Sequence, residues 1–466
     1  MTKKDTSAFR EHLANVDKRG RRIWLFPKII RGRFYKWRTR LSWLLLILLF
    51  SGPWYRIDGH PLFLFDVLEG KFIIFGIPFW PQDLYFLAFG ALTFLVFIIA
   101  FTAVFGRFFC GWICPQTIFM EMVFRKIENW IEGSPSQQQK LKNQPWNTEK
   151  IVKKGTKNTL FWLLSFLIAN TFLAYSIGTD KLLRIVTENP NKHIAGLVSM
   201  ILFTTVFYLV FSRIRELVCI MICPYGRLQG VLLDKNSVVV AYDHFRGEPR
   251  GKLLKTQQNT EKRGDCIDCG LCVDVCPTAI DIRNGTQMEC IHCTACIDAC
   301  DSVMDKISKP RGLIRYSSEE TLITGKQKFW TPRVCAYAGL WLIMITVFVL
   351  LIVLRKDLQA SVFRVTGSTY SVDANGDVTN LYDVKLVNKT FHRIQMQLKP
   401  VSGKFEIKLL GDTLWVDPGH VRNIPLMIRM KKKDIFDNTM PVSLEVYGNG
   451  KRMNILKEKF LAPVYQ

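Results

Sequence analysis

Twelve of the 13 cysteines in this chain of 466 residues fall into two sets of regular spacing. The larger set forms two consecutive runs, Cys266-x2-Cys269-x2-Cys272-x3-Cys276-Pro277 and Cys290-x2-Cys293-x2-Cys296-x3-Cys300. This is the spacing of proteins that hold two [4Fe–4S] clusters, in which the fourth cysteine of each run binds the other cluster. The sequence therefore predicts two clusters and a redox protein that moves one electron at a time. Their ligands would be Cys266, Cys269, Cys272 and Cys300 for the first cluster, and Cys290, Cys293, Cys296 and Cys276 for the second.

Zinc is the main alternative for cysteine pairs that are separated by two residues. Structural zinc sites usually place two such pairs well apart, whereas here four cysteines fall within a short stretch, and the arrangement occurs twice. Two-residue gaps let the backbone wrap one corner of a cluster, and the three-residue step sends the fourth thiolate to the neighbouring cluster. The second run departs from the pattern only after its last ligand, because Asp301 replaces the proline. The spacing favours iron–sulfur clusters.

Four further cysteines form a repeated motif, Cys110-Gly-Trp-Ile-Cys114-Pro115 and Cys219-Ile-Met-Ile-Cys223-Pro224. In a continuous helix each pair would lie on one face. If the proline restarts the helix, Cys114 and Cys223 would lie at a helix N-terminus, where the dipole lowers the pKa of a thiol. One such pair would fit simple packing, but two copies followed by proline predict a redox or copper site at Cys110, Cys114, Cys219 and Cys223.

Two smaller predictions concern sulfur-containing residues outside these patterns. Met120, Met122 and Met221 lie near the repeated motif and could add thioether ligands for Cu(I), although core packing is the simpler role for each. Cys335 stands alone and is expected to be a small buried hydrophobe.

Apolar runs at residues 41–55, 83–105, 159–178, 194–211 and 334–354 approach the roughly 20 residues that cross a bilayer. The first run is the shortest and contains Pro53. No cleavable signal peptide is evident, because forty strongly basic residues precede the first run. The sequence predicts a multi-pass protein with five spans.

The net charge of +24 follows the pattern of a membrane protein. Between the spans, Lys plus Arg number 13 in residues 1–40, 2 in 56–83, 9 in 106–158, 3 in 179–193 and 18 in 212–333. Basic loops face the cytoplasm. We therefore expect a cytoplasmic N-terminus and a cytoplasmic cluster domain, with residues 355–466 on the opposite side. Both repeated motifs then follow the cytoplasmic end of a span and should meet at one depth. The alternating charge needs no nucleic-acid partner.

Three other segments carry structural predictions. The helical spacing of residues 116–131 predicts an amphipathic helix on the membrane surface, with Phe119 and Trp130 on its apolar face and Arg125 and Glu128 on its polar face. The aromatic loop 56–82 is expected to rest on the outer membrane surface. Alternating short runs after residue 360, separated by turns such as Asn449-Gly450, predict an immunoglobulin-type β-sandwich.

These features predict five parts and a multi-domain membrane fold, an α-helical bundle with a double [4Fe–4S] insert and a C-terminal β-sandwich. The parts are a basic N-terminus (1–40), a four-span region with the two C-x3-C-P motifs (41–235), a ferredoxin-like domain (236–333), a fifth transmembrane helix (334–354) and the immunoglobulin-like domain (355–466).

The order of these parts, with CGWICP, CPYGRLQG and the double cluster run, closely resembles the FixG/RdxA (CcoG) family of cytochrome c oxidase accessory proteins. The resemblance covers nearly the whole chain. It implies a bacterial inner-membrane protein with a periplasmic immunoglobulin-like domain that supports assembly of cbb(3)-type oxidase. Family members are thought to reduce Cu(II) to Cu(I) for delivery to oxidase subunits or copper chaperones, with electrons from an unidentified cytoplasmic donor. On this basis we predict an oxidoreductase, either a cupric reductase or an electron carrier.

Two alternatives come from other classes of protein. Quinol-oxidising membrane ferredoxins also combine several spans, paired C-x3-C-P motifs and a double cluster domain; on that interpretation electrons come from quinol and no copper is handled. The chain could instead be a non-redox assembly scaffold whose clusters only stabilise the fold. The fifth span and the β-sandwich favour the oxidase accessory family.

Overall fold

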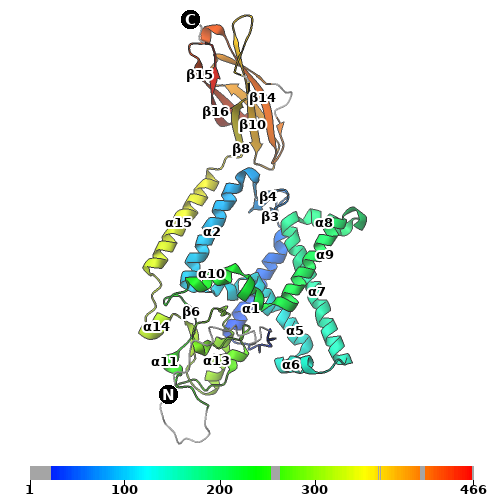
Figure 1. The fold of residues 1–466 in the computed structure, drawn as a ribbon, viewed down its shortest axis with the longest axis vertical. Coiled ribbons are helices and arrows are strands. Elements are labelled where there is room, and N and C mark those ends of the chain that lie inside the picture. The colour runs from blue at the N-terminus through cyan, green and yellow to red at the C-terminus, as the bar shows by residue number, and fades with distance from the viewer. Residues whose placement is uncertain (1–21, 253–262, 366, 368, 410–414, 464–466) are drawn as a thin grey trace. The chain divides into compact units, whose positions relative to one another are not determined.

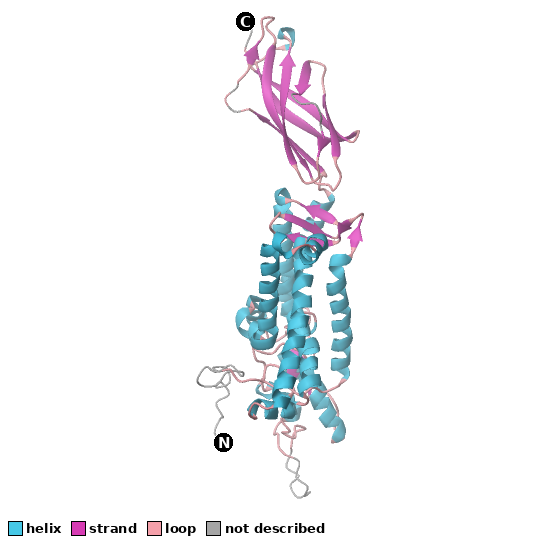
Figure 2. Cartoon of the chain, turned by 90° about the vertical axis from the view of Figure 1, so that its right-hand side faces the viewer, coloured by secondary structure: helices cyan, strands magenta, loops and turns pink. Residues whose placement is uncertain are grey.

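The computed structural model describes residues 22–252, 263–365, 367, 369–409 and 415–463, so part of the predicted basic N-terminus lies outside the described residues. The chain divides into two compact units, one formed by Met1–Arg56 and Gly90–Thr346 and the other by Ile57–Phe89 and Val347–Gln466. Helices make up most of the first unit, whereas strands make up most of the second (Figures 1 and 2). The loop after the first helix therefore belongs with the C-terminal domain, which the linear order of predicted domains did not indicate.

Within the described residues, four helical segments are long and apolar enough to cross a membrane: Pro81–Phe105, Thr148–Ile177, Ile194–Ile214 and Pro332–Val353. They match four of the five predicted apolar runs. The remaining run, 41–55, forms the second half of helix α1 (Arg33–Ser51), whose first half carries Arg33, Lys36, Arg38 and Arg40. Because of these basic residues, α1 has too short an apolar stretch to be counted with the four long apolar helices. A 3-10 turn at Gly52–Trp54, with Pro53 inside it, ends the helix.

The long helices are accompanied by short helical turns that carry the repeated cysteine motif. The helices of the first unit and its borders are α1, α2 (Leu84–Phe105), α3 (Phe108–Trp112), α4 (Pro115–Thr117), α5 (Arg125–Glu132), α6 (Pro135–Asn143), α7 (Thr148–Ile177), α8 (Thr179–Thr187), α9 (Ile194–Leu209), α10 (Pro224–Leu232) and α15 (Pro332–Val353). Three π-helical turns interrupt this order: η4 (Ile118–Phe124), η6 (Val210–Ile214) and η7 (Val218–Ile222).

Aromatic packing joins the first π-helical turn to the long helices. Phe124 of η4 meets Phe161 of α7 edge to face at 4.8 Å between ring centroids, and Phe119 meets Phe211 at 5.6 Å. All four rings are buried. A single apolar cluster therefore holds the segment after the first cysteine motif against helices α7 and α9 (Figure 1).

The insert that contains the double cysteine run is closed by a two-stranded antiparallel sheet. Strand β6 (Val239–Tyr242) pairs with β7 (Ile314–Ser317), so the two ends of the insert meet. Between them lie α11 (His244–Gly247), α12 (Leu271–Asp274), the turn η8 (Ile282–Asn284) and α13 (Ala295–Lys306), and α14 (Glu319–Thr324) follows. A small core that includes Val240, Met304 and Ile314 is built directly against the cysteines.

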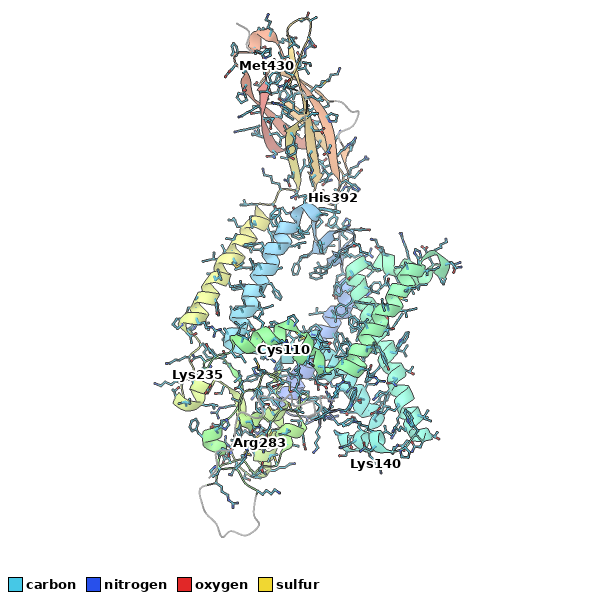
Figure 3. The ribbon with its side chains drawn as sticks, viewed as in Figure 1. Cys110, Lys140, Lys235, Arg283, His392 and Met430 are labelled. Atoms are coloured by element: carbon cyan, nitrogen blue, oxygen red, sulfur yellow. The ribbon has the colours of Figure 1, made fainter. Side chains whose placement is uncertain are left out.

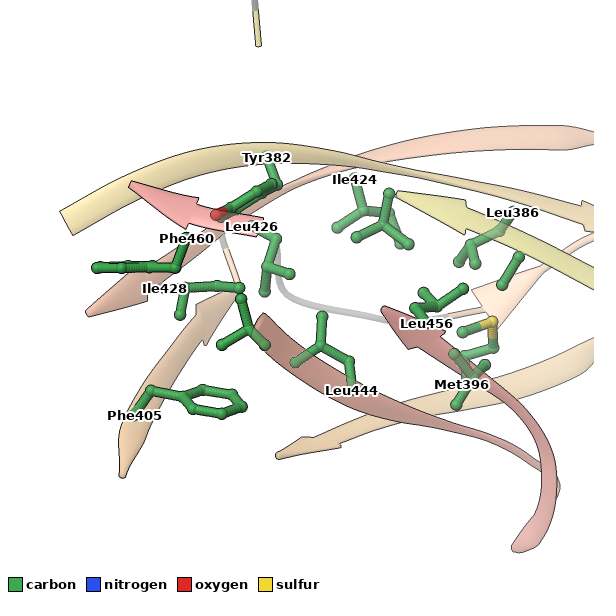
Figure 4. Packing of buried hydrophobic residues seen from close by; sticks show 14 of the residues in the cluster. Tyr382, Leu386, Met396, Phe405, Ile424, Leu426, Ile428, Leu444, Leu456 and Phe460 are labelled. Carbon is green, nitrogen blue, oxygen red and sulfur yellow. The ribbon is translucent and has the colours of Figure 1, made fainter. Parts of the chain in front are cut away.

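The C-terminal domain is a sandwich of two antiparallel sheets, as the alternating pattern predicted. One sheet has the order β12-β14-β10-β8 with β9 beside β10, and the other has the order β13-β11-β15-β16. Alternate side chains of β10, such as Tyr382 and Leu386, point inward and meet Leu444 and Phe460 of the facing sheet (Figure 4). The strands are β8 (Leu358–Arg364), β9 (Ser371–Val372), β10 (Val378–Asn388), β11 (Ile394–Pro400), β12 (Phe405–Leu409), β13 (Trp415–Val416), β14 (Val421–Met430), β15 (Thr439–Gly448) and β16 (Lys451–Leu461).

The aromatic loop 56–82, whose position on the outer membrane surface stays a prediction, folds as a small sheet against the C-terminal domain. It forms a three-stranded sheet of β3 (Phe63–Asp66), β4 (Lys71–Ile74) and β5 (Ile77–Phe79), after the short pair β1 (Arg56–Ile57) and β2 (His60–Pro61). Side chains of the loop pack on the sandwich: His60 stacks on Phe391 with ring centroids 3.8 Å apart. Trp80 lies so close to Gly419 that a β-carbon at position 419 would clash with the Trp80 ring.

A buried ion triad fastens this loop to the sandwich. The Asp83 carboxylate is fully buried and accepts from Arg355 at 2.7 Å and from Lys389 at 2.5 Å. Arg355 also donates to the carbonyl of Pro78 at 2.6 Å. Because every charge in the triad is paired, burial is tolerated, but removal of one partner would leave the others uncompensated.

Replacement of Asp83 by Asn should therefore destabilise the second unit by roughly 3–5 kcal/mol. Limited proteolysis of the full chain in detergent would detect the change as faster cleavage within residues 57–83. Asp180→Asn is the matched control, because its pair with Arg56 is largely exposed and an exposed pair contributes only about 0–1 kcal/mol. Equal protease sensitivity of the two variants would contradict a stabilising role for the triad.

Candidate redox site

The eight cysteines of the double run line two neighbouring cavities. One cavity, with an empty volume of about 370 Å³, is lined by Cys266, Cys269, Cys272 and Cys300. The other, of about 350 Å³, is lined by Cys276, Cys290, Cys293 and Cys296, with Cys272 at its edge. The remaining walls are mainly apolar and include Tyr242, Leu313, Val240 and Ile280. Four thiols around each dry cavity suit an iron–sulfur cluster, whose ligands are thiolates.

The backbone turns in the same way in both runs. Asp268 and Gly270, on either side of Cys269, have φ angles of 52° and 69°, and His292 and Thr294, on either side of Cys293, have φ angles of 54° and 63°. Left-handed backbone is uncommon for residues other than glycine. Its repetition at matching positions of the two runs indicates that the loops are shaped to wrap a bound group.

Burial strongly affects the thiols of these loops. It raises the pKa of Cys272, Cys290 and Cys300 to about 12 and that of Cys293 to about 11. Such thiols stay protonated unless cationic iron replaces the protons, because an apolar wall disfavours an unpaired thiolate. This chemistry also fits a metal cluster.

The structure brings the two C-x3-C-P motifs together. The Sγ atom of Cys110 lies 3.0 Å from the Oε1 atom of Gln229, a residue of the helix that follows the second motif. Phe109 meets Tyr225 edge to face at 5.9 Å, and the Arg107 guanidinium donates to the carbonyl of Gly226. Figure 3 shows Cys110 beside α10 in this cluster of contacts.

The prolines restart the helix in both motifs. Cys114 is the N-cap of α4 and Cys223 is the N-cap of α10, each with Pro at the first helical position. The pKa lowering predicted for a cysteine at the helix N-terminus is nevertheless wrong for Cys114. Burial raises the pKa of Cys110 and Cys219 to about 12, and it raises that of Cys114 although the N–H groups of Gln116 and Thr117 act in the opposite direction.

Negative charge on the cysteines of the second motif also raises the pKa of Cys110, as expected of close neighbours: Cys219 and Cys223 act in this way, as does Cys114 within the first motif. Within the described residues, no three His, Cys, Asp or Glu side chains are already arranged around a single metal ion. Of the candidate thioethers, Met120 and Met122 are buried and Met221 is half exposed. Cys335 is exposed, contrary to the predicted buried packing role.

The second cluster loop lies directly on the first C-x3-C-P motif. A β-carbon at Gly111 would come within 2.5 Å of the Ile291 carbonyl oxygen and 2.7 Å of the His292 carbonyl oxygen. The backbone N–H of Arg107 donates to Nδ1 of His292 at 3.1 Å. Only glycine at position 111 allows the two backbones to approach this closely.

Side chains on both sides reinforce that contact. Tyr316 donates to the His292 carbonyl at 3.1 Å and accepts from the indole N–H of Trp112 at 3.0 Å. The buried Arg38 donates to the Gly111 carbonyl at 3.1 Å. Burial and the charge of Arg107 lower the pKa of His292 to about 3, so its ring is neutral and accepts through Nδ1.

Sequence reasoning did not identify Arg38, Gln229, His292 and Tyr316 as part of this site. The one available signal was the glycine inside the first motif.

The basic segment before α1 and the start of that helix contact the same site. Lys28 pairs with Asp274 at 2.6 Å, next to the cluster loops. The backbone N–H groups of Phe34 and Tyr35 donate to the carboxylate of Asp298 at 3.0 and 2.7 Å. An acid at a helix N-terminus is stabilising. Asp298 lies between Cys296 and Cys300 on α13, so the cluster domain caps the first helix of the membrane region.

The segment 116–131 is oriented differently from the predicted surface helix. Its polar side chains are buried: Glu128 pairs with Arg215 through two contacts of 2.9 and 3.0 Å and with Lys157 at 3.2 Å. Trp130, predicted on the apolar face, is 80% exposed. A network of buried charges, rather than a lipid surface, therefore selects which face points inward.

Arg215 reaches this network from a strained position between the π-helical turns η6 and η7. Its φ angle is 51°, and it is buried although it is not glycine. Because η7 contains Cys219, the ion pair with Glu128 fixes the start of the second cysteine motif. π-Helical turns are common at functional sites.

Three family models match the chain. One describes a 4Fe-4S dicluster domain and matches residues 214–319, another describes a 4Fe-4S binding domain and matches 87–133, and the third describes the immunoglobulin-like fold at the C-terminus of FixG and matches 348–463. Together with the apolar helices, these matches define a multi-domain membrane iron–sulfur protein that ends in an immunoglobulin-like domain.

Several relatives share most of the length of the chain. Protein RdxB and Protein RdxA of Cereibacter sphaeroides are each 35% identical, over 78% of this chain and 79% of theirs. Nitrogen fixation protein FixG of Rhizobium meliloti is 32% identical over 78% of this chain and 76% of its own. A crystal structure of a FixG-related protein from Vibrio parahaemolyticus aligns with 24% of this chain and 100% of its own at 18% identity and a TM-score of 0.20. The chain belongs to the FixG/RdxA family.

Replacement of Gly111 by Ala should push the second cluster loop away from the membrane motif, because the new β-carbon would meet two carbonyl oxygens. Overpacking of this kind costs about 1–3 kcal/mol. We expect faster bleaching of the cluster absorbance in air. In the control Gly155→Ala the new methyl group meets nothing within 4 Å, so bleaching should be unchanged. Equal bleaching rates in the two variants would show that the close approach at Gly111 does not hold the second cluster loop in place.

Acid should weaken the network around Glu128. Burial alone would raise the pKa of this carboxyl group, but Arg215 and Lys157 lower it from 4.5 to about 2. A lowered pKa stabilises the fold fully above about pH 4.5, and the stabilisation is lost as the pH falls towards 2.

The test compares denaturant unfolding of the native chain and Glu128→Gln in detergent. The native chain should be more stable at pH 7 by on the order of 3 kcal/mol, and the difference should shrink below pH 4.5. Glu149→Gln, which breaks an exposed pair with Lys153, serves as the control. A difference between native and Glu128→Gln that does not change with pH would exclude this explanation.

Proposed function

We propose that this protein is a membrane electron carrier that reduces Cu(II) to Cu(I) at its four-cysteine site and so supports assembly of a cbb(3)-type oxidase. In this reaction Cu(II) would accept one electron and become Cu(I), and the clusters that the eight cysteines would hold would supply that electron. When bound, the two clusters supply reversible one-electron transfer. Copper is the substrate, and oxidase subunits or copper chaperones are the proposed recipients.

The proposed ligands follow the two cavities: Cys266, Cys269, Cys272 and Cys300 for one cluster, and Cys276, Cys290, Cys293 and Cys296 for the other. The cysteine run alone fixes the spacing of these thiols. The cavities support the exchange of the fourth ligand, because Cys300 lies with the first run and Cys276 with the second.

One observation carries the proposal: the loop of the second cluster and the first C-x3-C-P motif touch through Gly111. An electron leaving the loop that bears Cys290 and Cys293 therefore has a continuous covalent and hydrogen-bonded path to Cys110. The path runs from the His292 carbonyl through Tyr316 to the indole of Trp112, and a second one runs from the His292 ring to the backbone N–H of Arg107.

The chemistry of the four thiols suits the product of the proposed reaction. Cu(I) prefers soft thiolate and thioether ligands. Because burial keeps Cys110 and Cys219 protonated, metal binding there must release protons, which couples copper uptake to pH. The buried Met120 and Met122 lie on η4, the turn that follows the first motif.

The proposed orientation places the N-terminus and the cluster domain in the cytoplasm and residues 355–466 in the periplasm, across the bacterial inner membrane. It requires an odd number of crossings, so α1 must cross in addition to the four long apolar helices. The alternation of basic and non-basic loops supports this orientation. So does the grouping of residues Ile57–Phe89 with the C-terminal domain in one compact unit, because both must then lie on the same side of the membrane.

In the double variant Cys110→Ser/Cys219→Ser the rate of Cu(I) formation should fall by at least about tenfold. Loss of a residue that only supports a metal ligand already has an effect of this size. The assay follows a Cu(I)-specific chelator while the reduced protein is mixed with Cu(II) under anaerobic conditions. The cluster absorbance should stay intact. Cys335→Ser is the control, because this exposed thiol lies outside both motifs.

Two other results would replace the proposal. Re-oxidation by a quinone analogue but not by Cu(II) would identify a quinol-linked carrier. Loss of the clusters in the double variant, with lower protein abundance and no effect on copper, would identify a structural role for the four cysteines.

A further inference from the structure

A large groove lies where the start of α1 meets the cluster domain. Its empty volume is about 1500 Å³. One wall is formed by residues 30–32 and the first turns of α1, from Arg33 to Arg40. The other is formed by α13 and the loop that leads into β7. None of the twelve patterned cysteines lines this groove.

The acids in the groove are occupied by internal contacts. Asp298 caps α1, Asp301 accepts from the backbone N–H of Gly312 at 3.0 Å, and Asp305 pairs with Arg311 at 2.7 Å. Only Asp305 is neutralised by a cation of the described residues, but the six basic side chains that line the groove outnumber its three acids.

The cations of the groove are different. Arg31, Arg33, Lys36 and Arg40 are exposed, and none of them forms a salt bridge with a residue in the described part of the chain. Trp37, which is 55% exposed, lies among them with the Arg40 guanidinium over its ring. The groove therefore offers uncompensated positive charge around an aromatic anchor, a combination that favours an acidic partner.

The groove also lies next to the proposed cofactor ligands. Ile297, Asp301 and Ser302 line it, and they belong to α13, the helix that carries Cys296 and Cys300. Its floor contains Phe34 and Tyr316, whose rings meet at 6.1 Å, and Tyr316 bonds to Trp112 of the first C-x3-C-P motif. A molecule bound here would lie beside the helix that serves both cavities.

We propose that this groove is the docking site of a small acidic carrier protein that delivers electrons one at a time. The proposal rests on the proposed function, for which it supplies the donor side. In the transfer the carrier is oxidised by one electron, one iron–sulfur centre is reduced by one electron, and no bond forms or breaks. A nicotinamide nucleotide is a poorer fit, because it gives up electrons as a pair.

The test compares two double charge reversals in full-length protein in nanodiscs of zwitterionic lipid. Arg33→Glu/Lys36→Glu changes the groove, and Lys140→Glu/Lys142→Glu makes the same change of charge on helix α6, which lies away from the cluster domain (Figure 3). Purified flavodoxin serves as the acidic probe. One measurement is its Kd in the oxidised form, and the other is the rate at which its reduced form reduces the clusters.

At low ionic strength the groove variant should bind flavodoxin at least about tenfold more weakly than the native chain, and cluster reduction should slow in parallel. The α6 variant should behave as the native chain does, and added salt should remove the difference. Reduction by methyl viologen radical, a small cation, should be equally fast in all three proteins and show that the clusters are intact.

Equal Kd values for the two variants would overturn the proposal, as would native binding that salt does not weaken. Binding that the groove variant loses only for nanodiscs with anionic phospholipid, and not for flavodoxin, would assign the groove to lipid headgroups instead. No copper enters these measurements, so a failure of Cu(I) formation would leave this result unaffected. Conversely, the groove variant reduced by viologen should still reduce Cu(II).

Discussion

The contact between the Gly111 backbone and the carbonyls of Ile291 and His292 sets the distance between the cluster domain and the repeated cysteine motif. Two chain segments separated by more than 180 residues meet there without an intervening side chain. Electron transfer falls off steeply with distance, so this approach decides whether the two cysteine sets can act together. Arg38 and Tyr316 hold the contact by donating to the carbonyls of Gly111 and His292, and the backbone N–H of Arg107 holds it by donating to the His292 ring.

Buried charges position the elements around this contact. Glu128 holds Arg215 at the start of the second motif, Asp298 holds the first turn of α1 against the cluster helix, and Asp83 holds the aromatic loop on the β-sandwich. Each carboxylate joins segments that are distant in sequence. Burial of a charge is costly, so such contacts form only where hydrogen bonds and counter-charges are complete. They specify one arrangement, because a shifted register would leave a charge unpaired.

The sequence predicted much of the fold where the signal is local. The four long apolar helices and the alternating strands, such as β10 and β14, could be read from their period and length. Strand β16 has a weaker alternation in the sequence, because basic residues interrupt it. The prediction of which face of α5 points inward was wrong, because Glu128 and Trp130 follow the pattern of a surface helix. Burial of the Glu128 carboxylate becomes favourable only through Arg215 and Lys157, which are distant in the sequence.

The sequence by itself determined the identity and spacing of the candidate ligands, because the wrapping of a cluster by short cysteine gaps is a local property of the chain. It also determined which segments are apolar enough to enter a membrane. Only the tertiary structure decided that the two cysteine sets lie in contact, that the loop after α1 packs on the β-sandwich, and that free cations gather in a groove beside α13. Those outcomes depend on pairings such as Gly111 with His292 and Asp83 with Lys389. Their partners are too far apart in the chain for any local pattern to reveal them.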